Sequence, residues 1–330
     1  MIITRTPYRV SFVGGGTDLK EYYYKEDGMV LSAAIDKYIY VVIKKQIGIV
    51  EYKYRINYSK VEFCNYIDEI EHPIVREAFR LFEIDFPIEV TTFSDVPGKT
   101  GLGSSSSFAV GLVNGLFAIK GKTVTKHTMA SIASKIEIDI LKRNMGKQDH
   151  FAAAYGNINV ITFKSDETVI LDPVFHNKKT RTWMEENLYL FYTKVKRDAS
   201  VILNSQAKAT EEKRYELSKM KDLVSPLREI ISSGNNLNQI GTILDKSWHL
   251  KKMLTNDISS KEIDTYYKKA KKNGSLGGKL LGAGGGGFLL FYIEKEKKEK
   301  VFAGLNGLFN MPFKFDNGGT RITYYDQTTV

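Results

Sequence analysis

The chain has 330 residues, of which 42% are hydrophobic and 26% are charged, so a globally disordered protein is excluded. Its 48 basic and 38 acidic residues give a net charge of +10, which suits nucleic acid, a membrane surface or a phosphorylated small molecule. One cysteine excludes an internal disulfide and a multi-cysteine zinc site, and the length favours two domains, which we place at residues 1–180 and 181–330.

The first half of the chain is expected to contain strands followed by helices. Alternating and β-branched patterns predict strands at 39–43, 51–58 and 87–93. Apolar residues at helical spacing predict helices at 73–82, 104–119 and 125–144. We expect the two later helices to pack on a sheet formed by the strands.

The second half is expected to place helices on a small antiparallel sheet. Strands are predicted between residue 156 and about residue 171, and at 188–193, 288–293, 313–315 and 321–325. Residues 199–273 are mostly helical by pattern, and 297–309 is a further predicted helix. The basic C-terminal stretches interleave lysine with glutamate and lack interleaved aromatic residues, so they indicate solvated helix faces more than a nucleic-acid surface.

Neither a membrane span nor a secretion signal is expected. The longest uncharged run, residues 100–119, contains four serines, four glycines and an asparagine, which make insertion into a bilayer too costly. Arginines and a proline interrupt the first thirteen residues, so a signal peptide is not expected there. The expectation is a cytoplasmic protein.

Glycine concentrates in three segments, at residues 13–18, 97–107 and 282–287. Glycine lets a backbone turn with positive φ and approach a ligand closely. The middle segment runs directly into a predicted helix start, whose free N–H groups suit a phosphate chain. It is not a Walker A loop, because Phe93 stands where the first glycine of that motif is needed. The last segment is not a dinucleotide fingerprint, because it precedes a strand.

Together these segments resemble a known family. Residues 6–10 running into 14–18, residues 97–107 and residues 282–288 are similar to the three ordered motifs of the galactokinase, homoserine kinase, mevalonate kinase and phosphomevalonate kinase (GHMP) superfamily. The resemblance covers essentially the whole chain and departs at Ser106 and Ser107, where small apolar residues are usual. It implies an α+β fold, with an N-terminal domain like ribosomal protein S5 domain 2 and a ferredoxin-like C-terminal α/β domain.

Within the superfamily, residues 14–18 and 146–149 resemble the bacterial D-glycero-D-manno-heptose 7-phosphate kinases. Galactokinases carry Glu-His where Gly15 and Gly16 stand here. The resemblance implies ATP- and Mg²⁺-dependent phosphorylation of the anomeric hydroxyl to give the 1,7-bisphosphate, in nucleotide-activated heptose synthesis for surface polysaccharide. Two alternatives are another sugar-1-kinase, similar to a fucokinase, and a nucleic-acid-binding module.

The resemblance also implies roles for acidic and basic side chains. Asp149, expected just after a helix end, would be the catalytic base, with a helix cap as the alternative reading. Arg9 would lie near the transferred phosphate and the base. Glu137 and Ser105 would bind Mg²⁺, with Asp139 as the competing acid and Ser104 and Ser106 as competing hydroxyls.

The remaining implied site residues bind the nucleotide or the acceptor. The nucleotide loop would comprise Pro97, Gly98, Lys99, Gly101, Leu102, Gly103, Ser104, Ser105, Ser106 and Ser107. The acceptor residues would be Gly15, Gly16, Thr17, Asp18, Lys147, Arg197, Gly284 and Gly285. Among these, Asp18 would accept hydrogen bonds from sugar hydroxyls, and Lys147 and Arg197 are candidates for the sugar phosphate; for Arg197 the alternative is simple solvation. The expected partner is a small-molecule sugar phosphate, without nucleic acid or membrane, in a monomer or homodimer.

Overall fold

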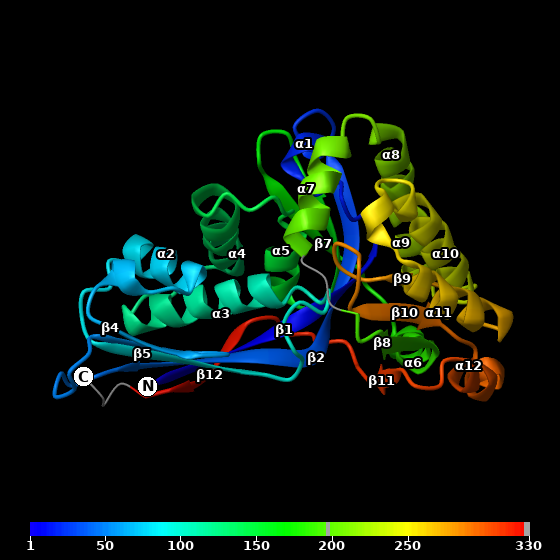
Figure 1. Cartoon of the computed structure of the whole chain (residues 1–330). Coiled ribbons are helices and arrows are strands. Elements are labelled where there is room, and N and C mark those ends of the chain that lie inside the picture. Colours follow the sequence, from blue (N-terminus) through cyan, green and yellow to red (C-terminus); the bar gives the residue numbers. More distant parts are fainter. Residues whose placement is uncertain (196–198, 327–330) are drawn as a thin grey trace.

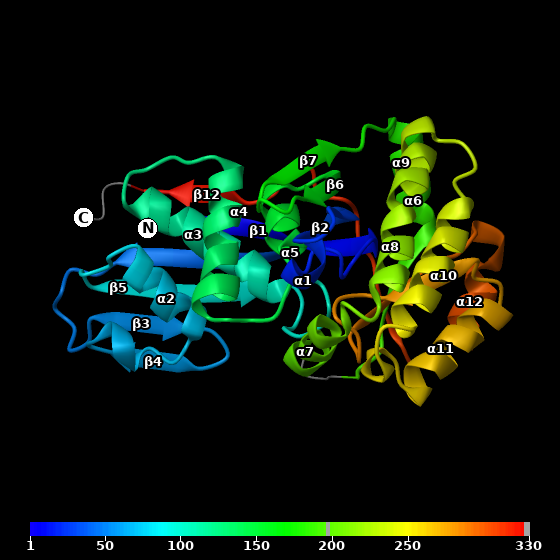
Figure 2. The same cartoon turned by 90° about the horizontal axis from the view of Figure 1, so that it is seen from above.

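The computed structural model describes residues 1–195 and 199–326, and it contains two sheets that are both flanked by helices (Figure 1). The larger sheet has eight strands and the smaller has four. Figure 2, seen from above, shows helices α2, α3 and α4 on one side of the molecule and helices α8, α10 and α11 on the other. Among the described residues, no helix is long and apolar enough to cross a membrane.

The larger sheet is organised around one long strand. Its strands are β1 (Ile2–Val13), β2 (Gly28–Lys45), β3 (Tyr54–Asn57), β4 (Val61–Cys64), β5 (Ile88–Ser94), β6 (Ile158–Phe163), β7 (Val169–Pro173) and β12 (Arg321–Tyr325). The order is β12-β1-β2-β5-β3-β4, and β6 carries β7 as a side branch. Strand β2 pairs with β5 along its second half and with β6 along its first half, because its 18 residues span both. All pairs are antiparallel except β3 with β5.

Four helices pack over one face of this sheet (Figure 1). They are α2 (Pro73–Leu81), α3 (Ser104–Ile119), α4 (Lys126–Ser134) and α5 (Gln148–Tyr155), and a short helix, α1 (Lys20–Tyr23), follows β1. Helix α3 is apolar around most of its circumference and lies in the middle, between the sheet and helices α4 and α5. Gly111 and Gly115 let it approach β1 and β2, since a Cβ on either would lie within 3 Å of their side chains.

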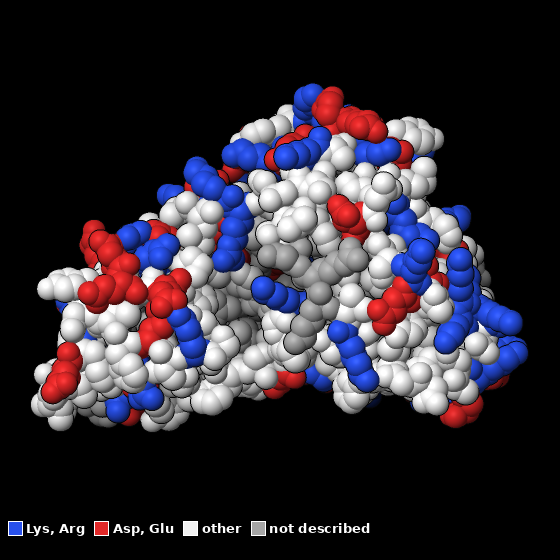
Figure 3. All heavy atoms as spheres, viewed as in Figure 1, with Lys and Arg blue, Asp and Glu red and all other residues white. Residues whose placement is uncertain are grey.

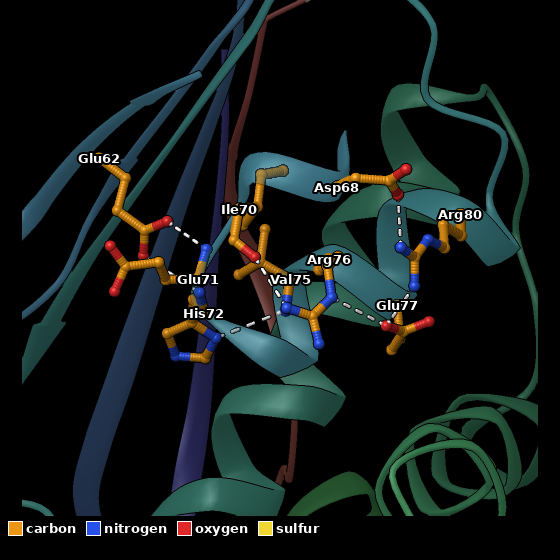
Figure 4. A network of polar contacts seen from close by, with 9 residues as sticks. All are labelled: Glu62, Asp68, Ile70, Glu71, His72, Val75, Arg76, Glu77 and Arg80. Carbon is orange, nitrogen blue, oxygen red and sulfur yellow. Dashed lines mark hydrogen bonds and ion pairs between the residues drawn. The ribbon is translucent and has the colours of Figure 1, made fainter. Parts of the chain in front are cut away.

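A polar network fixes the start of α2 (Figure 4). The Glu62 carboxylate accepts the backbone N–H groups of Glu71 and His72, at 2.6 and 3.1 Å. His72 is the N-cap, and its Nδ1 accepts from the Val75 N–H. The guanidinium of Arg76 then donates to the Ile70 carbonyl at 3.1 Å. This network anchors the helix to the hairpin of β3 and β4.

The second half forms a four-stranded antiparallel sheet with helices around it. Its strands run in the order β11 (Phe309–Met311), β8 (Leu188–Tyr192), β10 (Phe288–Tyr292) and β9 (Gly277–Leu280). The helices are α6 (Lys178–Asn187), α7 (Ala199–Ala209), α8 (Arg214–Asp222), α9 (Val224–Ser233), α10 (Gln239–Lys252), α11 (Lys261–Lys272) and α12 (Lys298–Gly304). Both figures place α7 between the two groups of helices.

Most of the elements predicted from sequence are confirmed, and three predicted segments differ from the structure. The helix predicted at 125–144 is α4 followed by a π-helical turn (Lys135–Ile140) and irregular chain. The helix predicted at 297–309 ends at Gly304, and 313–315 forms only an isolated bridge between Ile35 and Phe315. Helices α5 and α6 were not anticipated. Asp149 therefore lies in the first turn of a helix, where the sequence pattern placed it after a helix end.

The chain returns to its starting sheet at the end. Strand β12 pairs with β1, from Ile2 opposite Tyr325 to Arg5 opposite Arg321. The expected domain division at residue 180 falls inside α6, and the last strand of the second half completes the sheet of the first. Each half therefore contributes to the sheet that positions the site.

Candidate active site

A cavity of about 220 Å³ lies between the two halves. Its wall comes from the end of β1, the loop before α3, the start of α5, and helices α7, α8 and α10 with strand β9. Figure 3 shows the same face as Figure 1, with basic and acidic side chains interleaved on both sides of its middle. The site is therefore assembled from segments far apart in the sequence.

The loop before α3 presents an uncapped helix start to this cavity. Gly103, at φ +78°, is the N-cap residue and offers no side chain to the first N–H groups of the helix. Gly103, Ser104, Ser105 and Ser106 line the cavity, and the hydroxyl of Ser106 is buried without a hydrogen-bond partner among the described residues. Free N–H groups, the positive end of the helix dipole and an unused hydroxyl together form a cradle for an anion such as a phosphate chain.

The third glycine segment supports this loop from behind. A Cβ on Gly101 would lie 2.6 Å from the Leu281 carbonyl oxygen, and one on Gly282 would lie 2.5 Å from the Gly101 Cα. Both residues have positive φ, so the two segments pack backbone against backbone as only glycine permits. The segment at 282–287 thus helps hold the loop, and Gly282 itself lines the cavity.

Arg9 and Asp149 form a two-pronged ion pair in the cavity wall. The Arg9 Nε and Nη2 atoms each donate to one Asp149 oxygen at 2.7 Å, and Nη1 donates to the Gly101 carbonyl at 2.7 Å. The Arg9 backbone N–H also donates to the Leu102 carbonyl. Arg9 therefore fixes the orientation of the carboxylate and attaches it to the loop at the start of α3.

Asp18 supplies the second carboxylate of the cavity. Its oxygens accept the backbone N–H groups of Gly16 at 3.0 Å and Gln148 at 3.4 Å. Burial, followed by the negative charge of Asp149, raises the pKa of Asp18. The side-chain oxygen of Gln148 and the hydroxyl of Ser11, which line the same wall, are buried without partners among the described residues. This polar wall can receive the hydroxyl groups of a small ligand.

Glu137 and Ser105 meet in a corner beside the loop. The Ser105 hydroxyl donates to Glu137, and the Arg143 guanidinium donates to both, at 2.9 Å to Ser105. His150 Nε2 lies 2.9 Å from the other Glu137 oxygen. Glu137 is completely buried: burial acts to raise its pKa, but the hydrogen bonds from His150 and Ser105 and the positive charge of Arg143 outweigh burial and lower it. The competing acid, Asp139, is exposed.

This corner fits a magnesium ion by the chemistry of its donors. A carboxylate oxygen and a hydroxyl oxygen lie together, and Mg²⁺ in nucleotide sites is held by one or two such ligands plus phosphate oxygens. The π-helical turn makes this possible, because it turns Glu137 inward while Arg143 folds back onto it. Glu137 and Ser105 would hold the ion, and Arg143 supplies the positive charge beside them when no ion is bound.

Several predicted residues lie outside the cavity wall. The Lys147 ammonium pairs with Glu167 at 2.7 Å and lies over the Tyr23 ring. Gly284 and Gly285 pack against Ile258. The other predicted residues that do not line the cavity are Thr17, Pro97, Gly98, Leu102, Ser107 and Glu137, which lies in the corner behind Ser105. Arg197 lies outside the described residues.

Predicted residues that do line the cavity come from four segments. They are Arg9, Gly15, Gly16, Asp18, Lys99, Gly101, Gly103, Ser104, Ser105, Ser106 and Asp149.

Sequence reasoning missed four charged or titratable residues. Arg143 and His150 enclose Glu137, and Lys251 and Lys279 lie in the cavity wall. A signal for Lys251 was present, because it continues the buried stripe of α10 at residues 240, 244 and 247. The lysine-rich composition of the surrounding helices concealed it.

The chain matches two family models and several curated proteins. The GHMP kinase N-terminal domain matches residues 54–157, and the GHMP kinase C-terminal domain matches 223–310. It is 30% identical to D-glycero-alpha-D-manno-heptose 7-phosphate kinase of Campylobacter jejuni, covering 92% of this chain and 93% of that protein. It is 24% identical to the galactokinase of Pyrococcus furiosus, covering 91% of each.

Solved structures agree in fold. A D-glycero-D-manno-heptose 1-phosphate kinase from Bacteroides thetaiotaomicron superposes with a TM-score of 0.79 at 23% identity, over 99% of this chain and 100% of that one. A putative sugar kinase from Campylobacter jejuni gives a TM-score of 0.73 at 25% identity, over 97% of each chain.

The helix-start cradle, the paired carboxylate and the fold together define a kinase for small molecules. The chain belongs to the GHMP kinases.

Proposed function

We propose that the protein is an ATP- and Mg²⁺-dependent sugar kinase that phosphorylates the anomeric hydroxyl of D-glycero-D-manno-heptose 7-phosphate, giving the 1,7-bisphosphate. The observation that carries the proposal is the carboxylate of Asp149, held by Arg9 at 2.7 Å in a cavity that also contains Asp18 and the α3 start. Family membership and 30% identity over almost the whole chain to a heptose 7-phosphate kinase support it. The enzyme would act in the cytoplasm, in heptose activation for surface polysaccharide.

Asp149 is the group that would accept the proton of the attacking hydroxyl. Each carboxylate oxygen accepts one hydrogen bond from Arg9 and keeps a further lone pair, so the carboxylate can also bind a hydroxyl. Arg9 fixes its orientation and adds positive charge beside the transferred group. Because phosphoryl transfer depends mainly on positioning and charge stabilisation, these two contributions are the ones that the reaction needs.

Asp18 and its neighbours would orient the sugar. A carboxylate fixed by two backbone N–H groups can accept hydrogen bonds from adjacent sugar hydroxyls, and Gly15, Gly16 and Gln148 leave space and polar atoms beside it. The α3 start, with Ser104 and Ser106, would bind the nucleotide phosphates, and Ser105 with Glu137 would hold Mg²⁺. When bound, ATP would supply the phosphoryl group, and Mg²⁺ would offset the negative charge of the phosphate oxygens.

An ADP-release assay over a panel of acceptors tests the proposal. The panel comprises heptose 7-phosphate, heptose 1-phosphate, free heptose, galactose and fucose, and phosphorus NMR of the product identifies the modified oxygen. We expect the highest kcat/KM with heptose 7-phosphate and a new signal from an anomeric phosphate. Preference for fucose would favour the fucokinase-like alternative, for which a 25% identical plant fucokinase/GDP-fucose pyrophosphorylase gives some support. No turnover with any sugar would contradict the proposal.

A further inference from the structure

Two buried lysines line the cavity and have no part in the mechanism above. Lys251 lies on α10 and Lys279 on β9, and their exposed fractions are 7% and 2%. Lysine is rarely buried to this degree unless its charge is paired, because removing an ammonium group from water is costly. Each of these buried ammonium groups therefore needs a hydrogen-bond acceptor or an opposite charge beside it.

The partners present are backbone carbonyls. Lys279 Nζ donates to the Phe12 carbonyl at 2.8 Å, and Lys251 Nζ donates to the Gly282 carbonyl. Within residues 1–195 and 199–326, neither ammonium forms an ion pair with a carboxylate. Each ammonium has three N–H groups, so both keep donors beyond these single bonds.

The charges around the cavity leave this pair unbalanced. Asp149 is paired with Arg9, so Asp18 is the carboxylate whose charge most favours the charged form of Lys251. Burial, then the charge of Arg9, lowers the Lys251 pKa to about 8, and burial with the charges of Lys251 and Arg9 lowers the Lys279 pKa well below its ordinary value. An anion with about two negative charges, such as a phosphate monoester, would favour the charged form of both ammonium groups and supply the negative charge that this wall lacks.

We propose that Lys251, supported by Lys279, binds the phosphate group that the acceptor sugar already carries. This inference rests on the proposed function, because it assumes a phosphorylated sugar as substrate. The phosphoryl group transferred from ATP is the other phosphate that these lysines could bind. It already has the α3 start, Arg9 and the corner of Ser105 for its binding, whereas the two lysines come from α10 and β9, on the opposite half of the molecule.

Lys147, which the sequence indicated as a candidate for binding the sugar phosphate, is less suited to that role than Lys251. Its ammonium is matched by Glu167 at 2.7 Å and lies outside the cavity wall. Glu167 is further held by Lys20 and Tyr24. Binding a phosphate at Lys147 would require this group of contacts to open, whereas Lys251 needs no carboxylate to leave.

Equilibrium binding of heptose 7-phosphate, measured by calorimetry without nucleotide, tests the inference. Lys251→Met removes the charge and keeps most of the volume, Lys251→Arg keeps the charge, and Lys252→Met is the matched control on the same helix, where Lys252 faces Asp264 at 3.4 Å. We expect Lys251→Met to weaken binding roughly tenfold to a hundredfold, the loss of one charge-assisted hydrogen bond. Lys251→Arg should recover most of the affinity, and Lys252→Met should match wild type.

Two comparisons exclude a general structural effect. Free heptose and ADP should bind Lys251→Met as they bind wild type, and the melting temperature should not fall. Should Lys251→Met fail to fold, Lys251→Gln is used in its place. Unchanged affinity for heptose 7-phosphate, or equal weakening for free and phosphorylated heptose, would overturn the inference. Unchanged affinity with a large loss of kcat would instead assign Lys251 to the transferred phosphoryl group.

The wild-type protein separates this inference from the proposed function. If wild type uses heptose 7-phosphate and Lys251→Met binds it normally, the lysine assignment alone fails. If wild type prefers another sugar phosphate, the proposed substrate alone fails, and the same variants are measured with that acceptor. If wild type accepts only sugars without phosphate, both fail.

Discussion

Arg9 and Asp149 are 140 residues apart in the chain and face each other through two parallel hydrogen bonds of 2.7 Å. The third guanidinium nitrogen binds Gly101, so the carboxylate and the glycine loop are positioned by the same side chain. Since β1 carries Arg9 and α5 carries Asp149, the packing of α5 beside β1 sets the geometry of the pair. The predictions below begin with this pair.

Asp149→Asn should lower kcat by roughly a hundredfold or more, because an amide cannot serve as the proton acceptor. ADP binding should change little, since the nucleotide cradle lies at the α3 start. Steady-state kinetics and ADP calorimetry measure the two quantities. Asp85→Asn, at an exposed carboxylate, is the control. Wild-type turnover in Asp149→Asn would remove this residue from the mechanism.

Ser105→Ala should raise the Mg²⁺ concentration needed for half-maximal activity, because it removes one of the two oxygens proposed to hold the ion. Glu137→Gln should do the same, but it also breaks the contacts with Arg143 and His150 and is expected to destabilise the fold by about 3 kcal/mol or more. Ser105→Ala is therefore the cleaner variant. A Mg²⁺ titration compares it with Ser104→Ala, and a larger shift in the latter would transfer the ligand role to Ser104.

Gly146→Ala should impair acceptor binding through Asp18. A Cβ at position 146 would lie 1.8 Å from an oxygen of the Asp18 carboxylate, so that carboxylate must move away from its backbone N–H donors. We expect a loss of roughly tenfold or more in acceptor kcat/KM, the size of one charge-assisted hydrogen bond, with the KM for ATP nearly constant. Gly98→Ala adds its Cβ in open space and should keep the acceptor KM. Equal acceptor kinetics in both variants would contradict the role of Asp18.

Lys251→Met should stabilise the ligand-free protein at neutral pH. The pKa of Lys251 is about 8 in the folded protein against 10.5 for an ordinary lysine, because burial and then the charge of Arg9 lower it more than Asp18 and Asp149 raise it. Below pH 8 the buried charge costs about 3 kcal/mol, and this penalty disappears as pH rises from 8 to 10.5, where the unfolded chain holds more protons than the folded one.

Urea unfolding of both proteins at several pH values checks this prediction. The gain in the free energy of unfolding should be largest at pH 7 and should narrow above pH 8. Lys252→Met provides the reference, because Lys252 is partly exposed and pairs with Asp264. If the difference in the free energy of unfolding between Lys251→Met and wild type is constant from pH 7 to 10, burial does not perturb the pKa of Lys251.

The sequence by itself determined the local parts of the site. The glycine run at 97–103 and the serines that follow predict the α3 start at Ser104, which the structure confirms, because backbone freedom and helical periodicity are properties of neighbouring residues. Motif order likewise indicated the GHMP kinase fold, which the family models confirm. The same resemblance identified the candidate catalytic and metal-binding residues, and their roles remain predictions. They are Arg9, Asp149, Glu137 and Ser105.

Only the tertiary structure decided which charges meet. Lysines in lysine-rich helices are usually solvated, and the burial of Lys251 depends on how α10 packs against β9 and β1. In the same way, Arg143 reaches Glu137 because the predicted long helix changes to a π-turn at residue 135, and Lys147 is paired by Glu167 from the β6–β7 turn. The helical spacing of Lys251 places it on the buried face of α10, but which groups surround and pair a charge is set by segments distant in sequence.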